Sequence, residues 1–417
     1  MRVMMLGGGT NQLCAIKRIK ERGDTVIVSD YLESSPGKLI ADYTVLADTF
    51  SYEKTVQAAR ETGADAVLTV GTDQPVLTAA RVAKALGLIS GLSPETALAV
   101  TNKKYMKSIF CDHRIPTVAY ELLSKDTDYK DLESFQYPAV LKPVDSQGQR
   151  GIFKVYNPEQ VAENLAECLK YSKTGEALLE AYYENQEVTV SGWVKEGKTY
   201  ILTMTDRVTF SEDEKIGVCV SHEHPSVHIK EYGDTAKDLT EDIVKAFEIE
   251  NGPIYFQFLI GAKGMVVNEI ACRIGGAYED QFIPAITGFD ILDAQLDLVQ
   301  GQAVSLDSIQ DYDFRDNQSC VSVQLFFAQP GQITSTTHKE DMLTIEGVED
   351  FRCHYSQGQS IPKTENASAR AGFGLIYGNT EKEIRDRIGK FFDNLHITSV
   401  TNENLVIRGS RGNRHND

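Results

Sequence analysis

The sequence has little positive charge. Its 42 lysines and arginines face 60 aspartates and glutamates, which leaves a formal net charge of −18 over 417 residues. Such a surface repels nucleic acid and anionic membranes, so neither is expected as a main partner. A chain of this charge that binds a phosphorylated ligand has to gather its few basic groups locally.

Several other signals are missing. No stretch of about 18 apolar residues occurs, so no membrane-spanning helix is expected. The apolar stretch 1–6 is too short for a signal peptide. The seven cysteines are scattered and form no Cys-x-x-Cys pair, which argues against a disulfide or zinc framework. These absences predict a cytoplasmic protein with free thiols.

Residues 1–100 alternate short apolar runs with amphipathic stretches, which predicts a doubly wound parallel sheet. The runs expected as buried parallel strands are Val3–Leu6, Val26–Val28, Tyr43–Leu46 and Ala66–Val70. The stretches expected as helices are Gln12–Arg22, Tyr52–Thr62 and Pro75–Leu86. The first turn, Gly7-Gly8-Gly9-Thr10-Asn11, resembles a dinucleotide-binding turn without its last glycine. NAD binding and a plain strand-to-helix turn both stay open there.

Beyond residue 138 the pattern changes to that of antiparallel strands. Ala177–Ala181, Glu187–Val194 and Thr199–Thr205 are expected as successive strands of one sheet, and Ile254–Ile260 with Met265–Ile270 as a hairpin. Short strands are expected after Arg315. The expected helices are Pro158–Tyr171, Thr235–Phe247, Asp280–Ile286, Ile291–Gln300 and Glu381–Phe392.

Lys142 ends an otherwise apolar strand, Pro138–Lys142. A buried lysine is costly unless it meets an anion. In the loop that follows, Gly148 and Gly151 let backbone amides approach a polyanion. The pattern favours a phosphate-binding lysine and loop. A hairpin whose lysine reaches solvent is the alternative.

Glu269 stands near the end of a predicted strand, with Gln257 on the paired strand and Arg273 four residues further on. Magnesium prefers hard oxygen ligands that it shares with phosphate, so Glu269 and Gln257 are candidate ligands. Arg273 could stabilise charge on a transferred phosphoryl group or an acyl oxyanion. The adjacent Gly275 and Gly276 would permit close ligand approach. A structural ion pair between Glu269 and Arg273 is the alternative.

Between these motifs, an apolar strand turns polar at residues 178–183. The backbone of Glu180, Ala181, Tyr182 and Tyr183 is a candidate edge for a nucleotide base. Glu187 would then reach the ribose hydroxyls.

In this order, the motifs Thr101–Lys107, Tyr137–Gly151 and Val266–Gly276 resemble those of the ATP-grasp superfamily. The resemblance is closest to the branch with biotin carboxylase, the carbamoyl phosphate synthetase large chain, glycinamide ribonucleotide synthetase and bacterial L-amino-acid ligases. It implies an α/β and α+β fold with three parts. These are an N-terminal doubly wound parallel sheet (1–100), a two-lobed ATP-grasp domain (101–310, lid lobe about 116–190) and a small mixed β/α subdomain (311–417).

The resemblance also implies roles for the nucleotide-binding residues. Lys103 and Lys142 would contact the ATP phosphates, and Gln147–Gly151 would be a mobile loop over them. Glu180–Tyr183 would form the adenine hinge, with Glu187 as the ribose ligand.

For catalysis, the resemblance implies Glu269 as the ligand of Mg²⁺, with Mn²⁺ as an alternative, and Arg273 as the catalytic arginine. Arg370 would clamp a substrate carboxylate. The implied reaction uses small molecules: ATP phosphorylates a carboxylate, and an amine then attacks the acyl phosphate to form an amide or peptide bond. Amino-acid-like substrates are favoured, and a homodimer is compatible with the pattern.

Two positions depart from the superfamily pattern. Gln257 stands where an acid is common, and Ala271 where an asparagine is common, so a non-catalytic ATP-binding protein stays open. A purine-pathway ligase similar to glycinamide ribonucleotide synthetase is the other alternative, although basic residues for a ribose phosphate are not evident. His222, His224 and His228 are interpreted as part of a solvated loop rather than a metal site.

Overall fold

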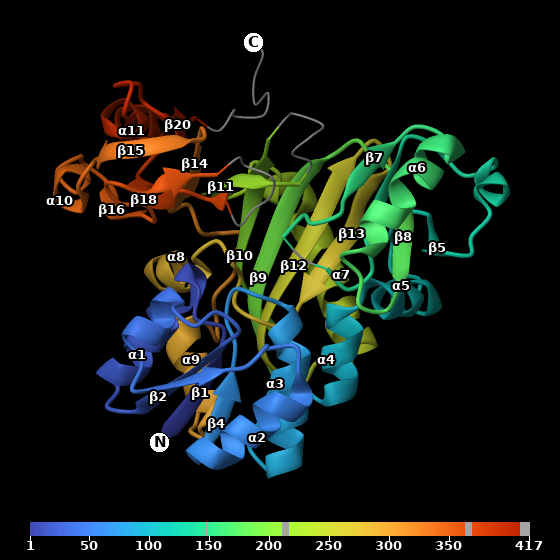
Figure 1. The fold of residues 1–417 in the computed structure, drawn as a ribbon, viewed down its shortest axis with the longest axis horizontal. Coiled ribbons are helices and arrows are strands. Elements are labelled where there is room, and N and C mark those ends of the chain that lie inside the picture. Colours follow the sequence, from blue (N-terminus) through green and yellow to red (C-terminus); the bar gives the residue numbers. More distant parts are fainter. Residues whose placement is uncertain (147, 211–216, 363–368, 409–417) are drawn as a thin grey trace.

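The structure, a computed structural model, describes residues 1–146, 148–210, 217–362 and 369–408. Figure 1 shows an N-terminal body, a lid lobe and a C-terminal body arranged around a long central sheet. The predicted combination of a parallel N-terminal sheet with antiparallel sheets is confirmed. Within the described ranges, none of the helices combines the length and apolar composition needed to cross a bilayer.

The N-terminal body is a four-stranded parallel sheet in the order β3-β2-β1-β4. Its strands are β1 (Arg2–Leu6), β2 (Thr25–Asp30), β3 (Tyr43–Leu46) and β4 (Ala66–Leu68), and its helices are α1 (Leu13–Glu21), α2 (Tyr52–Thr62) and α3 (Gln74–Leu86). Because the strands are parallel, their carboxyl ends share one edge, and that edge faces the centre of the molecule. The 3-10 turns η1 (Thr10–Gln12) and η2 (Pro36–Leu39) lie in the loops at this edge.

The lid lobe is an antiparallel sheet in the order β5-β8-β6-β7 with one long helix. Its elements are β5 (Tyr120–Ser124), η3 (Tyr129–Leu132), β6 (Ala139–Pro143), β7 (Phe153–Val155), α6 (Pro158–Leu169) and β8 (Glu176–Ala181). The prediction that residues 177–181 belong to one sheet with 187–194 and 199–205 is therefore wrong. β8 pairs with β5 and β6 on its two sides, and the chain then crosses to the central sheet through Tyr182–Asn185.

The central sheet runs β13-β12-β9-β10-β11-β14-β18-β16, and all of its neighbouring strands are antiparallel. The strands are β9 (Gln186–Lys195), β10 (Lys198–Thr209), β11 (Cys219–His224), β12 (Asn251–Gly261), β13 (Gly264–Ala271), β14 (Cys320–Ala328), β16 (Val348–Cys353) and β18 (Gly372–Gly378). The flanking helices are α4 (Pro94–Thr101), α5 (Lys103–Asp112), α7 (Ile229–Ala246), α8 (Glu279–Thr287) and α9 (Ile291–Val299).

Two apolar cores hold these layers together. One face of the sheet packs on α5 and α7 through residues such as Phe110, Ile243 and Phe258. The other face shares a core with α8, α9 and the N-terminal sheet, which includes Trp193, Phe282 and Val28. The N-terminal body is thus fixed against the central sheet by buried apolar contact.

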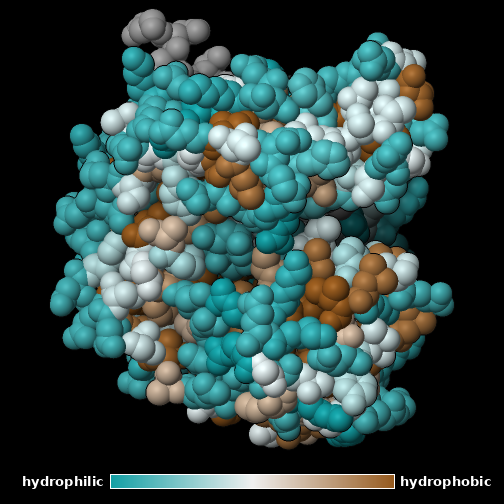
Figure 2. Space-filling model, turned by 90° about the vertical axis from the view of Figure 1, so that its left-hand side faces the viewer, coloured by the Kyte–Doolittle hydropathy of each residue, from teal (hydrophilic) through white to brown (hydrophobic). Residues whose placement is uncertain are grey.

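The chain after Arg315 forms short strands as predicted, and several of its strands also belong to the central sheet. β14, β16 and β18 extend the central sheet, while β15 (Gly331–Thr336), β17 (Ser360–Ile361) and β19 (Ile397–Ser399) form a small separate sheet. β20 (Val406–Ile407) pairs with β14, and α10 (Lys339–Met342) and α11 (Glu381–Asn394) complete the body. Figure 2 shows that one side of the molecule is mainly hydrophilic, with apolar surface in separate patches. The homodimer that is compatible with the sequence pattern stays a prediction.

Candidate active site

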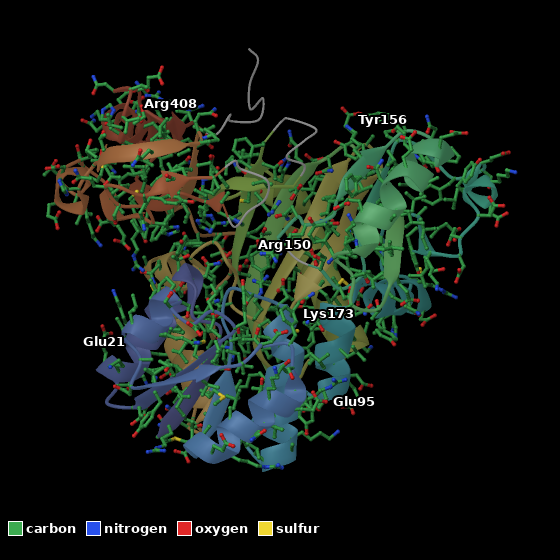
Figure 3. The ribbon with its side chains drawn as sticks, in the orientation of Figure 1. Glu21, Glu95, Arg150, Tyr156, Lys173 and Arg408 are labelled. Atoms are coloured by element: carbon green, nitrogen blue, oxygen red, sulfur yellow. The ribbon has the colours of Figure 1, made fainter. Side chains whose placement is uncertain are left out.

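A cavity of about 1160 Å³ lies where the three bodies meet. It is lined by most of the predicted site residues: Lys103, Lys142, Gly148, Glu180, Ala181, Tyr182, Tyr183, Glu187, Gln257, Glu269, Arg273, Gly276 and Arg370. Gly151 and Gly275 are not among its lining residues, and Gln147 lies outside the described residues. The volume exceeds what one small ligand needs, so a nucleotide and a second substrate can share it. Arg150 and Lys173 also line the cavity, and Figure 3 shows them in the middle of the molecule, between the N-terminal body and the lid lobe.

Lys142 meets a carboxylate inside the protein, so the alternative in which it reaches solvent is wrong. Its Nζ lies 2.5 Å from Oε2 of Glu180, and Nζ of Lys107 lies 2.9 Å from Oε1 of the same group. Burial alone would raise the pKa of Glu180, but the two ammonium groups outweigh burial and lower it to about 2. Glu180 therefore stays ionised between two lysines.

Lys107 was missed by sequence reasoning, although the signal was present. It follows Lys103 by four residues, so both side chains leave the same face of α5. Lys107 is 1% exposed and also donates to Oγ1 of Thr117 at 2.6 Å. Burial is the main reason that its pKa is lowered.

Glu269 pairs with Lys103 rather than with Arg273. The carboxylate Oε1 lies 2.9 Å from Nζ of Lys103, which also donates to the Ser146 carbonyl at 3.1 Å. Burial would raise the pKa of Glu269, but Lys103 and Lys142 lower it overall. The alternative, an ion pair between Glu269 and Arg273, is wrong, and Glu269 is an ionised oxygen donor at the cavity wall.

A β-bulge brings Asn268 to the same wall. Gln257 pairs with Glu269, but the next pair is Phe258 with Val267, so Asn268 is the extra residue. Val267 and Ile270 both pack in the core behind the sheet, whereas Asn268 and Glu269 both line the cavity. A bulge re-aims side chains in this way, and strict strand alternation does not reveal it. Gln257, Asn268 and Glu269 thus offer three oxygen donors on one wall.

Arg273 forms an ion pair with Asp73, at the start of α3. Its Nη1 also donates to the Ile274 carbonyl at 3.2 Å, and its guanidinium lies 5.0 Å from the centre of the Tyr255 ring. The pair joins the N-terminal body to the strand that carries Glu269. The plane of the guanidinium is therefore fixed on several sides at the cavity wall.

Gly275 and Gly276 lie so close to neighbouring protein atoms that neither position has room for a side chain. A Cβ on Gly275 would overlap the carboxyl group of Glu279, and one on Gly276 would lie 2.8 Å from the Gly71 carbonyl. Gly276 lines the cavity, whereas Gly275 packs behind it. Burial raises the pKa of Glu279 to about 7.

The expected adenine edge has part of its backbone already engaged. The N–H of Ala181 donates to the Ala119 carbonyl at 2.9 Å, and that of Tyr182 to the Pro138 carbonyl at 2.9 Å. A base would therefore use other backbone groups of this segment. Glu187, expected at the ribose, forms an ion pair with Arg207, which sequence reasoning did not single out.

Two of the three histidines are not in a solvated loop. His222 and His224 lie on β11 and are 2% and 4% exposed, which corrects the interpretation for these two, whereas His228 is half-buried directly before α7. Burial, together with Arg207 and Arg370, lowers the pKa of His222 well below its usual range. Among the described residues, no group of three His, Cys, Asp or Glu side chains is arranged to hold a metal. His222 is a neutral group on the cavity wall.

Arg370, from the C-terminal body, reaches the end of the Val266–Gly276 motif. Its Nη1 donates to the Gly276 carbonyl at 3.0 Å, and its guanidinium lies 5.8 Å from the centre of the Tyr278 ring. His354 lines the same region and lies 3.2 Å from the Tyr278 hydroxyl through Nε2. Arg370 and Arg273 thus give this end of the cavity two cations.

Comparison with known proteins agrees with this arrangement. Residues 135–280 match the family described as ATP-grasp domain, and residues 324–399 match the L-amino acid ligase C-terminal domain 2. Dapdiamide A synthase of Enterobacter agglomerans is 22% identical over 271 residues, which cover 61% of this chain and 63% of that protein. The chain therefore spans less than two thirds of this relative.

Two further similarities extend over more of the chain. Phosphoribosylamine–glycine ligase of Methanosphaera stadtmanae is 23% identical over 344 residues, 74% of each chain. The crystal structure of L-amino acid ligase from Bacillus licheniformis aligns with a TM-score of 0.80 at 18% identity, covering 95% of this chain and 98% of that one. The fold is shared over nearly the whole length.

Proposed function

We propose that this chain, whose residues 135–280 are an ATP-grasp domain, is an ATP-dependent, ADP-forming ligase that joins a carboxylate to an amine. The observation that carries the proposal is the convergence on one cavity of two lysines, an ionised carboxylate and a fixed arginine: Lys103, Lys142, Glu269 and Arg273. The similarity to dapdiamide A synthase and to the C-terminal domain of L-amino acid ligases supports amino-acid-like substrates.

The reaction divides into two displacements. A carboxylate oxygen of the first substrate attacks the γ-phosphorus of ATP, the bond to the bridging oxygen breaks, and ADP leaves. An amine then attacks the carbonyl carbon of the acyl phosphate, loses a proton and expels inorganic phosphate. Lys103 and Lys142 hold the phosphates, and Arg273 meets the charge that grows during transfer. The protein contributes position and charge rather than covalent chemistry.

The cavity wall fits Mg²⁺ at the nucleotide. Glu269 supplies a charged oxygen, and Gln257 and Asn268 supply neutral ones, which are the ligand types that this ion prefers. When bound with ATP, the ion neutralises phosphate charge. Asn268 would thus supply the neutral oxygen ligand that an asparagine commonly provides at the position of Ala271.

Asn268→Ala is expected to weaken Mn²⁺ binding to the complex with ADP by at least about tenfold, because a neutral ligand is lost beside a single carboxylate. Electron paramagnetic resonance of bound Mn²⁺ measures this without turnover. Ala271→Asn, on the same strand, should restore binding in the Asn268→Ala background. Equal Mn²⁺ affinity in Asn268→Ala and the parent protein would remove Asn268 from the metal site.

The N-terminal wall argues against a purine-pathway ligase. Among the described residues, those of 1–100 that line the cavity include no lysine or arginine, but do include Asp30 and Asp73. A ribose phosphate needs cationic partners. We therefore rank an amine without a phosphate group first. A non-catalytic ATP-binding protein is distinguished by the absence of ADP formation with any substrate pair.

Labelled oxygen tests the acyl-phosphate route. If the substrate carboxylate carries ¹⁸O, one labelled oxygen should appear in the released phosphate, because that oxygen attacks phosphorus and leaves with it. Mass spectrometry of the phosphate is the measurement. Unlabelled phosphate together with amide product would exclude this route, and AMP as the nucleotide product would point to adenylation.

A further inference from the structure

Three large apolar side chains of the N-terminal body face the cavity without being buried. Tyr31 and Leu32 directly follow β2 and are 62% and 48% exposed, and Phe50, in the loop after β3, is 40% exposed. All three line the cavity. We call them the apolar lip. Exposed apolar surface inside a ligand cavity indicates a ligand with apolar surface of its own.

The lip is held in place by hydrogen bonds from the loop that carries it. Asp30 accepts from the N–H groups of Gly8 at 2.7 Å and Leu32 at 2.8 Å. Nζ of Lys38 donates to the carbonyls of Asp30 at 2.9 Å and Leu32 at 2.5 Å. The turn is therefore fixed on both sides of Tyr31 before any ligand arrives, as a preformed subsite requires.

The same hydrogen bonds occupy the charged groups of the loop, so these groups are not available to a ligand. The Asp30 carboxylate is used by two backbone donors, and Lys38 is buried and turned to carbonyls away from the cavity lining. Among the described lining residues of the N-terminal body no cation is present. The N-terminal body therefore offers an apolar surface at Tyr31 and Leu32, and the cation next to the lip, Lys173, comes from the lid lobe and lies on Phe50.

The sheet order relates the lip to the reaction centre. Asp73, the partner of Arg273, follows β4, whereas Tyr31 and Leu32 of the lip follow β2, with β1 between the two strands. Neighbouring strands lie about 4.8 Å apart, so the strands that carry these two groups are roughly 10 Å apart. That span matches an amino acid with a large side chain, whose reacting group lies beside Arg273 and whose side chain reaches the lip.

The lid lobe covers the lip from the other side. Nζ of Lys173 lies 3.6 Å from the centre of the Phe50 ring, and both Lys173 and Tyr171 line the cavity. Figure 3 shows Lys173 between the lid lobe and the N-terminal body. The ammonium group of Lys173 thus occupies the face of the Phe50 ring, which leaves Tyr31 and Leu32 as the surface open to an apolar group.

We propose that the apolar lip is the subsite for an uncharged apolar side chain on the amine substrate. The assignment rests on the proposed ligase function. The carboxylate substrate is placed at the opposite end, because Arg273 and Arg370 supply cations there and the N-terminal wall does not. The amine substrate is left for the N-terminal side.

Amino acid amides test this assignment, because their blocked carboxyl group lets them react only as amines. Phenylalaninamide, leucinamide, serinamide and O-phosphoserinamide are each offered with the twenty common amino acids as carboxylate donors, and ADP release is measured. We expect kcat/KM for the first two to exceed that for serinamide at least about tenfold. For O-phosphoserinamide, kcat/KM should not exceed that for these two amides, even though its phosphate could meet the Lys173 ammonium.

Leu32→Asp is the diagnostic variant, and Leu39→Asp is its control, since Leu39 is 77% exposed and is not among the cavity lining. Leu32→Asp should lower kcat/KM for leucinamide at least tenfold, mainly through KM, with ATP affinity unchanged. Leu39→Asp should behave as the parent protein. Equal kinetics in the two variants, or no preference for apolar amides, would overturn the lip assignment while ADP release keeps the ligase proposal. Absence of ADP release with every amide would overturn both.

Discussion

Replacing Arg273 by lysine is expected to lower the turnover number at least about a hundredfold, with little change in ATP affinity. The arginine side chain is only 8% exposed and has its plane fixed by Asp73, the Ile274 carbonyl and the Tyr255 ring. A fixed donor aimed at developing charge typically contributes two to three orders of magnitude, roughly, to the rate. Lysine keeps the charge beside Asp73 but loses the planar fork.

The choice of lysine separates catalysis from folding. Alanine would leave Asp73 as an unpaired carboxylate between the N-terminal body and the central sheet, so a loss of activity could follow from a loss of structure. Single-turnover kinetics and calorimetry with ATP measure the rate and the affinity in Arg273→Lys. Asp73→Asn is the control, because it removes the ion pair and leaves the guanidinium. Loss of turnover in Asp73→Asn equal to that in Arg273→Lys would show that the pair acts through structure.

The N-terminal sheet and the cavity motifs could be predicted because their signals are local. Parallel strands that are covered on both faces appear as continuous apolar runs, such as residues 26–28 in β2. The prediction that residues 43–46 form a buried strand is wrong, because β3 is an edge strand of the sheet and leaves Tyr43 and Leu46 exposed. Identification with the ATP-grasp superfamily is confirmed for residues 135–280. The order of the motifs was enough to predict that Lys142, Glu269 and Arg273 share one site, and all three line the same cavity.

What could not be predicted depends on contacts between distant segments. Arg273 pairs with Asp73 from another body, and Glu269 with Lys103. β8 looks like any half-buried strand, and its membership of the lid sheet is fixed by pairing with β5 and β6. The bulge at Asn268 and the burial of His222 likewise arise from neighbouring strands, which alternation within one strand does not report.

Lys142→Met is expected to weaken ATP binding by at least about tenfold and to abolish turnover. In the structure Lys142 is paired with Glu180. When ATP binds, the Lys142 ammonium group can turn to the phosphates, while Lys107 keeps Glu180 ionised. Hydrogen bonds to charged groups contribute about 1.5–3 kcal/mol, which corresponds to ten- to a hundredfold in affinity, roughly. Calorimetry with ATP and magnesium measures the loss.

Lys107→Met is the matched control for this experiment. Each substitution removes one of the two ammonium groups around the buried Glu180 carboxylate, so both should lower the melting temperature. Lys142 lines the cavity and Lys107 does not, so the loss of ATP affinity should be confined to Lys142→Met. An equal loss of ATP affinity in the two variants would mean that the lysines act together by holding Glu180 and the lid lobe in place. A loss in Lys142→Met alone would identify Lys142 as a direct ligand of the phosphates.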